Sequence, residues 1–187
     1  VIKWLEDEKP EVICLQETKV SDKDFPTKPF EDIGYEVKFF GQKSYNGVAI
    51  ITKNKIEDIK YGFAGELNQT KISDELQTQK RIISGLINGI RIINVYVPNG
   101  SSLNSDKYKY KLNWLAILKE YLVEQSKRGE PTCLLGDFNI ALNDNDIHSP
   151  DKFTGSIMAS DNERKLLREA LGSRFKDSFR VFEKFSG

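Results

Sequence analysis

The stretch Thr132–Leu142 reads TCLLGDFNIAL, and it opens with a short apolar segment between Pro131 and Gly136. Such a segment, bounded by a proline and a glycine, predicts a buried β-strand. The strand ends near Asp137, and Asn139 follows two residues later. Because residues i and i+2 of an extended chain point to the same side, we expect both side chains to face one reacting group. The carboxylate could bind a hard metal ion or accept a proton, and the amide could stabilise negative charge. An ordinary Asp/Asn turn is the alternative.

Two other predicted strands also end in reactive groups. The apolar run Val12–Leu15 leads to Glu17, and another strand ends near Tyr96. Loops at one rim of a rigid scaffold often carry binding and catalytic residues. Two carboxylates with an amide, in a chain whose sole histidine is His148, favour Mg²⁺ or Mn²⁺ over zinc. Taken singly, each residue has a strong alternative: Glu17 as a solvated turn residue and Tyr96 as an aromatic residue at the edge of the core.

The composition sets limits on the class of protein. The 187 residues include 28 Lys and Arg and 28 Asp and Glu, enough chain for a single domain over 1–187. A net charge of zero gives no general attraction to nucleic acid, so a DNA partner needs a local basic patch. Cys14 and Cys133 both lie in predicted buried strands, which favours apolar packing over a disulfide. No apolar run is long enough to cross a bilayer. The sequence does not begin with Met, so any targeting segment would lie outside it.

Periodicity and turn residues predict the other elements. We expect the end of a helix before Pro10, a helix over Tyr108–Gln125, and a helix over Asp161–Leu171 with Asp161 as N-cap and Gly172 as C-cap. Asn88-Gly89 predicts a hairpin with a type I′ turn between strands over 81–87 and 90–97. Further strands are expected over Tyr35–Phe40, Val48–Thr52 and Ile56–Phe63, and loops over Asp22–Phe30 (loop or short helix), Ala64–Gln79 and Asn143–Phe153. Mainly antiparallel strands flanked by helices indicate an α+β fold with two packed sheets.

Several motifs together point to a known family. In chain order they are EVICLQETK (11–19), GQKSYNGVAIITK (41–53), QKRII (79–83), NVYVPNG (94–100), GDFNIAL (136–142), DI (146–147), SDNER (160–164) and FKDSFR (175–180). In this order and spacing the chain resembles, over almost its whole length, the exonuclease III-type apurinic/apyrimidinic endonucleases of the endonuclease/exonuclease/phosphatase superfamily. The resemblance implies a four-layered α/β sandwich, with two mainly antiparallel sheets packed face to face, helices outside, and the active site at one rim.

The resemblance also implies an activity and roles for four residues. The family cleaves the DNA backbone at abasic sites, and many members trim 3′ ends. The chain would thus be a DNA-repair phosphodiesterase that depends on Mg²⁺, with Mn²⁺ as the alternative, and acts on double-stranded DNA with abasic sites or 3′ ends. It would be a monomer in a bacterial-type cytoplasm, associated with the nucleoid and with no membrane. Glu17 would bind the metal and Tyr96 would orient or activate at the scissile phosphate. Asp137 would align or deprotonate the attacking water, and Asn139 would stabilise charge on the phosphoryl oxygens. Asp137 and Asn139 are also candidate metal ligands.

Other residues are expected to contact DNA. Lys19, Arg81 and Asn99 match family positions near phosphates or the rim, with ordinary surface polarity as the alternative. Lys43 lies in a turn that the family uses against the duplex. The basic and aromatic cluster Lys107–Lys111 could touch the DNA backbone, but a solvated helix face explains it equally well.

The chain departs from the family pattern at both ends. The family begins with a strand that carries an asparagine and ends with strands that carry an aspartate and a Ser-Asp-His segment, none of which is present. His148 lacks the preceding Ser-Asp, so we interpret it as a loop residue. We therefore expect an internal portion of a longer enzyme, unstable alone and cleaving at least several hundred-fold more slowly, roughly the cost of one lost general acid or base. The rival hypotheses are a sister enzyme acting on lipid or inositol phosphates and a non-catalytic DNA-binding module.

Overall fold

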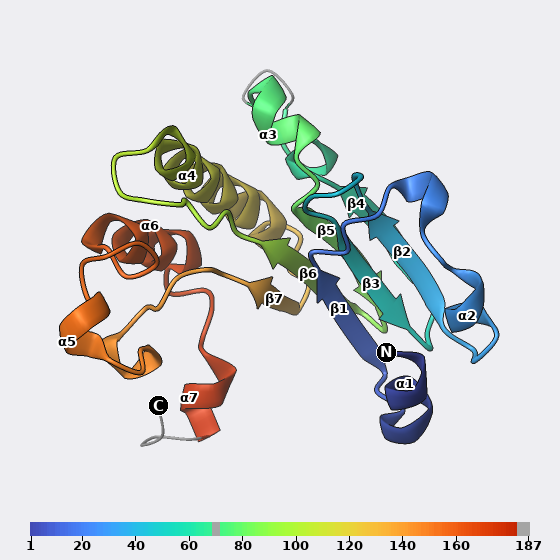
Figure 1. Ribbon diagram of the computed structural model, residues 1–187. Helices are drawn as coiled ribbons and strands as arrows, with labels where there is room; N and C mark the ends of the chain where they lie inside the picture. The colour runs from blue at the N-terminus through green and yellow to red at the C-terminus, as the bar shows by residue number, and fades with distance from the viewer. Residues whose placement is uncertain (69–71, 183–187) are drawn as a thin grey trace. The chain divides into compact units, whose positions relative to one another are not determined.

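The computed structural model describes residues 1–68 and 72–182 (Figure 1). The chain divides into two compact units. The first unit comprises Val1–Tyr96 and Gly129–Asp137, and the second comprises Val97–Arg128 and Phe138–Gly187. The single domain expected over 1–187 stays a prediction.

The first unit contains two β-sheets, whose strands are labelled in Figure 1. The strands are β1 (Val12–Gln16), β2 (Glu36–Phe40), β3 (Val48–Thr52), β4 (Glu57–Tyr61), β5 (Ile82–Ile87), β6 (Ile90–Tyr96) and β7 (Thr132–Asp137). The three-stranded sheet has the order β1-β3-β2 and the four-stranded sheet the order β4-β5-β6-β7. All pairs are antiparallel except β6 and β7, which run parallel. The helices of this unit are α1 (Ile2–Glu8), α2 (Lys28–Glu31) and α3 (Asp74–Thr78).

The two sheets pack face to face through one apolar cluster. It joins residues of β3, such as Ile50, to residues of β5 and β6, such as Ile83 and Ile92. A second cluster lies on the other face of β3, where Ile51 packs with Leu5 of α1 and with other side chains near α2. Alternate residues of β3 therefore enter different clusters, as the pleat of a strand requires. The expected pair of packed sheets is confirmed.

The hairpin predicted from Asn88-Gly89 is present between β5 and β6. Asn88 has φ 50° and Gly89 has φ 78°, the two positive φ values that a type I′ turn requires. Ile87 pairs with Ile90 directly beside the turn. The local sequence thus sets the register of the two central strands.

The prediction that β1 and β7 are buried strands was wrong. Every residue of β1 is half-buried, and β7 is mostly half-buried. Within the described residues each strand lies at the edge of its sheet and pairs with a single neighbour. Cys14 is half-buried and Cys133 is exposed, and both are free thiols. An apolar sequence favours strand formation, but the number of neighbours decides how deeply the strand is buried.

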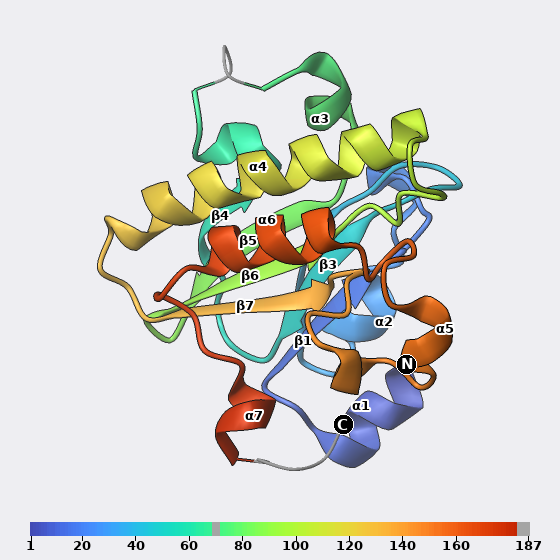
Figure 2. The ribbon, with the colours of Figure 1, turned by 90° about the vertical axis from the view of Figure 1, so that its left-hand side faces the viewer.

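The second unit contains α4 (Asp106–Ser126), α5 (Pro150–Phe153), α6 (Asp161–Leu171) and α7 (Ser178–Phe182). Figure 2 shows α4 and α6 side by side. The predicted N-cap of α6 was off by one residue, because Ser160 caps the helix and forms a capping box with Glu163. The Ser-x-x-Glu pattern satisfies two backbone N–H groups that an Asp161 cap would leave open. Gly172 is the C-cap, as predicted.

The segments expected as loops contain short helical turns. Ala64–Gln79 includes most of a 3-10 turn over Phe63–Gly65 and all of α3, while Asn143–Phe153 includes the 3-10 turn Asp144–Asp146 and α5. The segment Asp22–Phe30, expected as a loop or short helix, contains the 3-10 turn Asp22–Asp24 and most of α2. Four-residue and five-residue helices are too short to produce the periodicity used for prediction. Residues 69–71 of the first loop lie outside the described residues. In the part of the chain that is described, no helix is long and apolar enough to cross a membrane.

Candidate active site

Four of the predicted site residues meet at one rim of the first unit. Glu17 follows β1, and its carboxylate lies 2.8 Å from the Nζ of Lys19. It also accepts a hydrogen bond from the side chain of Tyr96, the last residue of β6. Arg81 lies with its guanidinium carbon 4.6 Å from the centre of the Tyr96 ring and donates to the Tyr96 carbonyl oxygen at 3.3 Å. The rim thus holds one carboxylate, one phenol and two cations.

The contacts set the protonation states of this cluster. Hydrogen bonds from Lys19 and then from Tyr96 lower the pKa of Glu17, so the carboxylate is charged at neutral pH. Burial, and then the hydrogen bond to Glu17, raises the pKa of Tyr96, so the phenol keeps its proton and acts as a donor. The hydrogen bond to Glu17 raises the pKa of Lys19. With Lys19 and Arg81 both charged, the cluster is net positive and suits an anionic ligand.

Asp137 lies beside Tyr96 because β6 and β7 are parallel neighbours. Tyr96 and Asp137 are register partners, and the strands of a sheet lie about 4.8 Å apart. Register partners direct their side chains to the same face of the sheet. The preceding Gly136 has φ 136°, and a Cβ at this position would lie 1.9 Å from the carbonyl oxygen of Val95. A glycine is therefore required where the Gly-Asp motif packs against β6.

Asn139 does not continue the strand, so the extended geometry expected for Asp137 and Asn139 is not present. Strand β7 ends at Asp137, and Asn139 has φ 48° in the left-handed region. Within the second unit its side-chain amide donates to the carbonyl oxygen of Val97 at 3.0 Å. Its Oδ1 accepts a long hydrogen bond of 3.4 Å from Asn99. The structure therefore brings the predicted residues Asn99 and Asn139 together.

A polar link between the sheets, which the sequence analysis missed, supports the Glu17 cluster. Asn94 is fully buried in β6. Its amide nitrogen donates to the carbonyl oxygens of Leu15 and Ala49 at 2.9 and 3.0 Å, and its oxygen accepts from Gln16 at 2.7 Å. These bonds fix the end of β1, one residue before Glu17, against β6. A lone asparagine inside the apolar run RIINVYV (91–97) is the sequence signal that could have revealed it.

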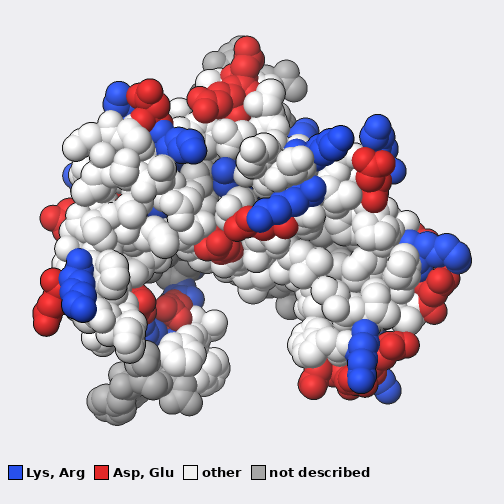
Figure 3. Space-filling view, viewed as in Figure 1, with Lys and Arg blue, Asp and Glu red and all other residues white. Residues whose placement is uncertain are grey.

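Lys43 lies in an exposed turn that is bound to the Glu17 segment. Lys19 donates its backbone N–H to the carbonyl oxygen of Asn46 at 2.9 Å, and Ser44 donates to that of Lys19 at 3.1 Å. The turn is therefore part of the same rim. Figure 3 shows Lys and Arg side chains next to Asp and Glu on the face that it draws, so no single-sign surface distinguishes this view. The DNA contact of Lys43 stays a prediction.

The cluster Lys107–Lys111 is not a uniform basic face. Lys107 and Lys109 are exposed, as the solvated-face alternative requires, whereas Tyr108 and Lys111 are buried in the second unit.

The donor set at the rim fits a hard divalent cation. Glu17 is ionised, its side chain is 42% exposed, and it already holds a cationic ammonium at 2.8 Å. Hard cations such as Mg²⁺ are often bound by one or two carboxylates, with water and substrate phosphates completing the coordination. Among the residues that the structure describes, no three His, Cys, Asp or Glu side chains form a metal-binding group.

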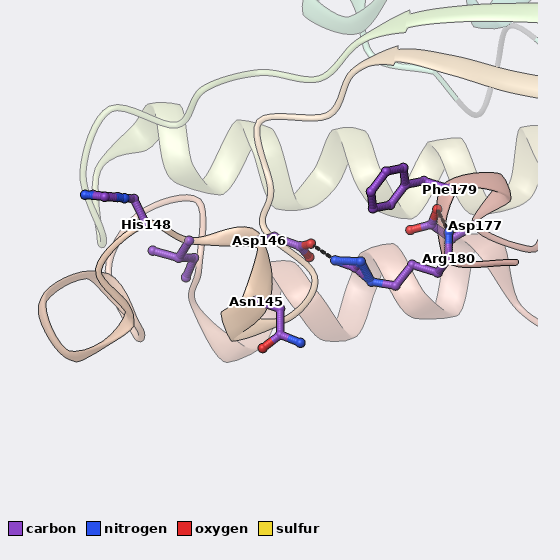
Figure 4. A pocket seen from close by; sticks show the side chains of 7 residues that line it. Asn145, Asp146, His148, Asp177, Phe179 and Arg180 are labelled. Atoms are coloured by element: carbon purple, nitrogen blue, oxygen red, sulfur yellow. Dashed lines mark hydrogen bonds and ion pairs between the residues drawn. The ribbon is translucent and has the colours of Figure 1, made fainter. Parts of the chain in front are cut away.

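His148 lies in a separate cavity of the second unit. The cavity has a volume of about 620 Å³ and is lined by Asn145, Asp146, Ile147, His148, Asp177, Phe179 and Arg180. Figure 4 shows Arg180 paired with Asp146, while the His148 ring points away from this pair. The interpretation of His148 as a loop residue agrees with its position between η4, the 3-10 turn Asp144–Asp146, and α5.

The match to a family model covers almost the whole chain. Residues 1–183 match the endonuclease/exonuclease/phosphatase family. The chain belongs to this family. It is a family of divalent-metal-dependent nucleases, which agrees with a hard-cation ligand at the rim.

Individual members of the family show the same relationship. The chain is 33% identical to exodeoxyribonuclease III of Haemophilus influenzae, over 94% of this chain and 67% of that protein. An AP endonuclease from Archaeoglobus fulgidus has a TM-score of 0.86 and 37% identity, over 97% of this chain and 67% of that one. A 3′ phosphatase from Neisseria, solved with a product DNA hairpin, has a TM-score of 0.90 and 34% identity, over 98% and 68%. The chain thus spans about two thirds of these family members. The resemblance and the α+β sandwich fold predicted from the sequence are confirmed.

Proposed function

We propose that the chain is an exonuclease III-like phosphodiesterase of DNA repair that uses Mg²⁺ and cleaves the backbone at abasic sites or trims DNA 3′ ends. The observation that carries this proposal is the Glu17, Tyr96 and Arg81 cluster with Asp137 on the adjacent strand. Similarity to an exodeoxyribonuclease III, an AP endonuclease and a 3′ phosphatase bound to a DNA hairpin supports DNA as the substrate rather than a lipid or inositol phosphate. We further propose a monomer of the bacterial cytoplasm, by analogy with the bacterial family member.

Each residue of the cluster has a proposed role. Lys19 and Arg81 attract the phosphate, and Lys43 and Asn99 hold the flanking backbone. Mg²⁺ or Mn²⁺, held by Glu17 with Asp137 or Asn139 as further ligands, would supply a positive charge that polarises the phosphoryl oxygens.

The remaining steps use side-chain protons and hydrogen bonds. The protonated phenol of Tyr96 donates to a phosphate oxygen and orients it. Asp137 accepts a proton from the attacking water, or aligns that water, as a general base. The amide of Asn139 donates to the oxygen that gains charge in the transition state. The amide nitrogen of Asn139 carries two protons, and its bond to the carbonyl oxygen of Val97 uses one of them.

The test is a nicking assay with the full-length protein on a duplex that contains one abasic site, compared with an undamaged duplex. We expect cleavage with Mg²⁺ or Mn²⁺, none in a chelator, and none of a phospholipid headgroup. Glu57→Gln, an exposed strand carboxylate of β4, is the matched control for Glu17→Gln. Metal-independent cleavage, or equal rates for the two variants, would contradict the proposal.

A further inference from the structure

A fully buried ion pair lies beneath Asn99 and Asn139 in the second unit. Lys111 of α4 and Glu163 of α6 both have side chains with 0% exposure, and their Nζ and Oε1 atoms are 2.5 Å apart. Lys111 belongs to the basic and aromatic cluster Lys107–Lys111, yet it faces the interior. Burying two charges is costly unless each is paired and fully hydrogen-bonded. The partners of each group therefore indicate what the pair does.

The ammonium of Lys111 contacts the backbone of the two segments that carry the asparagines. Besides Glu163, it donates to the carbonyl oxygen of Asn139 at 2.7 Å and to that of Asn99 at 3.1 Å. An ammonium has three protons, so these three acceptors account for all of them. Neither carbonyl lies in a helix or strand, and Asn139 has φ 48°. The ammonium thus supplies the partner that regular secondary structure would otherwise provide.

Glu163 accepts several hydrogen bonds besides its ion pair with Lys111. Its Oε2 accepts from the backbone N–H and the hydroxyl of Ser160, at 3.1 and 2.6 Å, and its Oε1 accepts from the backbone N–H of Met158 at 3.1 Å. The side chain of Lys111 is also enclosed, because a Cβ on Gly100 would lie 3.1 Å from its Cδ. The capping box of α6 therefore fixes the carboxylate, and the carboxylate fixes the ammonium.

We propose that Lys111 and Glu163 are positioning residues for the phosphate chemistry of Asn139 and Asn99. This inference rests on the proposed function. An apolar pair of similar volume is often at least as stable as a buried ion pair, so stability alone does not account for this one. Its specific effect is to fix the positions of the carbonyl groups of Asn99 and Asn139. The directions of the two asparagine side chains are fixed as a result. Neither side chain touches the substrate in this proposal.

The central experiment removes both charges together in the full-length protein. Lys111→Met with Glu163→Gln keeps the volumes and leaves no uncompensated buried charge. We expect a cooperative melt at a lower temperature, because the carbonyl oxygens of Asn99 and Asn139 lose a donor. We also expect an unchanged KM for abasic duplex and a kcat at least tenfold lower. The matched control is Lys119→Met with Glu169→Gln. This pair also joins α4 to α6, at 3.0 Å, but it is exposed and should leave kcat unchanged.

A double-mutant cycle separates positioning from general structural support. Asn139→Ala alone should lower kcat by about 10²–10³, as expected for a lost transition-state donor. If the buried pair acts through Asn139, adding Lys111→Met and Glu163→Gln to that variant should lower kcat no further. The inference would be overturned if the two substitutions lowered kcat as much in the Asn139→Ala protein as they do in wild type. It would also be overturned if Lys111→Met with Glu163→Gln (the doubly neutral variant) kept the wild-type kcat.

Two further outcomes remain informative. If the doubly neutral variant does not melt cooperatively, Glu163→Gln alone decides, because it keeps the side-chain shape. We expect it to lower kcat several-fold at constant KM, and a wild-type kcat would refute the positioning role. If wild-type protein shows no metal-dependent cleavage of DNA, the proposed function fails. A wild-type enzyme that cleaves, with variants that cleave equally well, would refute the inference alone.

Discussion

Glu17 combines two features that oppose each other: it is exposed enough to bind a metal, and it is already paired with a cation. The ammonium of Lys19 lies 2.8 Å from its carboxylate, and the phenol of Tyr96 donates to it as well. An incoming divalent ion must share or displace this ammonium. In the proposed function, Lys19 therefore competes with the metal for Glu17.

The pH dependence of metal binding should report this competition. The folded-state pKa of Glu17 is lowered, so the carboxylate stays charged as the pH falls through the usual carboxyl range. Binding is then lost only as the pH falls through the lowered pKa. Lys19→Met removes the largest cause of the shift and should move the pH midpoint of Mn²⁺ binding upward. It should also tighten binding at neutral pH, because a like charge is gone. Calorimetric titration across pH measures both effects, with Lys43→Ala as a control that should change neither.

Asp137 is proposed to act on the attacking water rather than on DNA affinity. Asp137→Asn keeps the shape of the side chain and removes its negative charge. Cleavage under single-turnover conditions should fall by about 10²–10⁴-fold, the usual contribution of a general base. The affinity for abasic duplex should stay the same or increase, since a charge that repels phosphate is lost. Rates near wild type, or a parallel loss of binding, would assign Asp137 a different role.

The pairing of β6 with β7 sets the site at the level of elements. Gly136 has a φ that other residues rarely adopt and no room for a Cβ beside Val95. Gly136→Ala should therefore destabilise the protein by more than about 3 kcal/mol, from strain and overpacking together. Gly129→Ala is the matched control, because this glycine has φ 72° but no atom within 4 Å of an added Cβ. It should cost only about 1–2 kcal/mol. Urea unfolding of both variants makes the comparison, and equal losses would show that the close approach to Val95 is not limiting.

The opposite end of β6 is secured by a buried arginine. Arg91 has no exposed side-chain surface. It pairs with Asp58 of β4 at 2.7 Å and with Glu130, before β7, at 2.9 Å. Burial opposes ionisation of Asp58, but hydrogen bonds from Lys60 and Arg91 outweigh it and lower the pKa of this carboxyl. The guanidinium thereby ties three strands together.

Replacing this arginine should cost stability and spare the chemistry. Arg91→Met leaves two carboxylates without their shared partner and should lower the free energy of unfolding by about 3–5 kcal/mol. The kcat of the remaining folded protein should be unchanged, since Tyr96 lies at the other end of the strand. Lys60→Met, which removes a partly exposed partner of Asp58, should cost under about 1 kcal/mol. Denaturant titration measures the free energy of unfolding, and kcat is measured without denaturant. A large loss of kcat in folded Arg91→Met would contradict the prediction that Arg91 supports stability but not catalysis.

For the molecule as a whole, a net charge of zero makes DNA binding depend on a few local contacts. The logarithm of the affinity should fall linearly with the logarithm of salt concentration, with a slope of roughly −0.9 per phosphate neutralised. Lys43→Ala should flatten this slope by roughly one unit. Lys28→Ala, which removes an exposed lysine paired with Asp32 on α2, should leave it unchanged. Fluorescence anisotropy at several salt concentrations provides the measurement. If both variants keep the wild-type slope, the phosphate contact lies elsewhere.

Features that depend on nearby residues were predictable from the sequence. The Asn88-Gly89 turn, the long helix α4 and the polar strand ends at Glu17 and Tyr96 all follow from local patterns. Features that depend on distant residues were not. The exposure of β7 depends on how many strands pair with it, the conformation of Asn139 on partners at Val97 and Lys111, and the burial of Lys111 on a carboxylate far along the chain. Local chemistry thus predicted the polar residues at the strand ends, whereas the contacts that support them required the fold.

The first unit is built from two separate pieces of chain, and this has a consequence for its synthesis. Residues 1–96 can form both sheets except for β7, because their pairings are hairpins or involve nearby strands. Residues 97–128 must then leave the ribosome before β7 can add to β6. A nascent chain released at this stage would already hold Glu17, Arg81 and Tyr96 together, but it would lack Asp137. The proposed catalytic base therefore joins a cluster that is already assembled, and a translational pause before residue 137 would leave the proposed metal ligand Glu17 in place without Asp137.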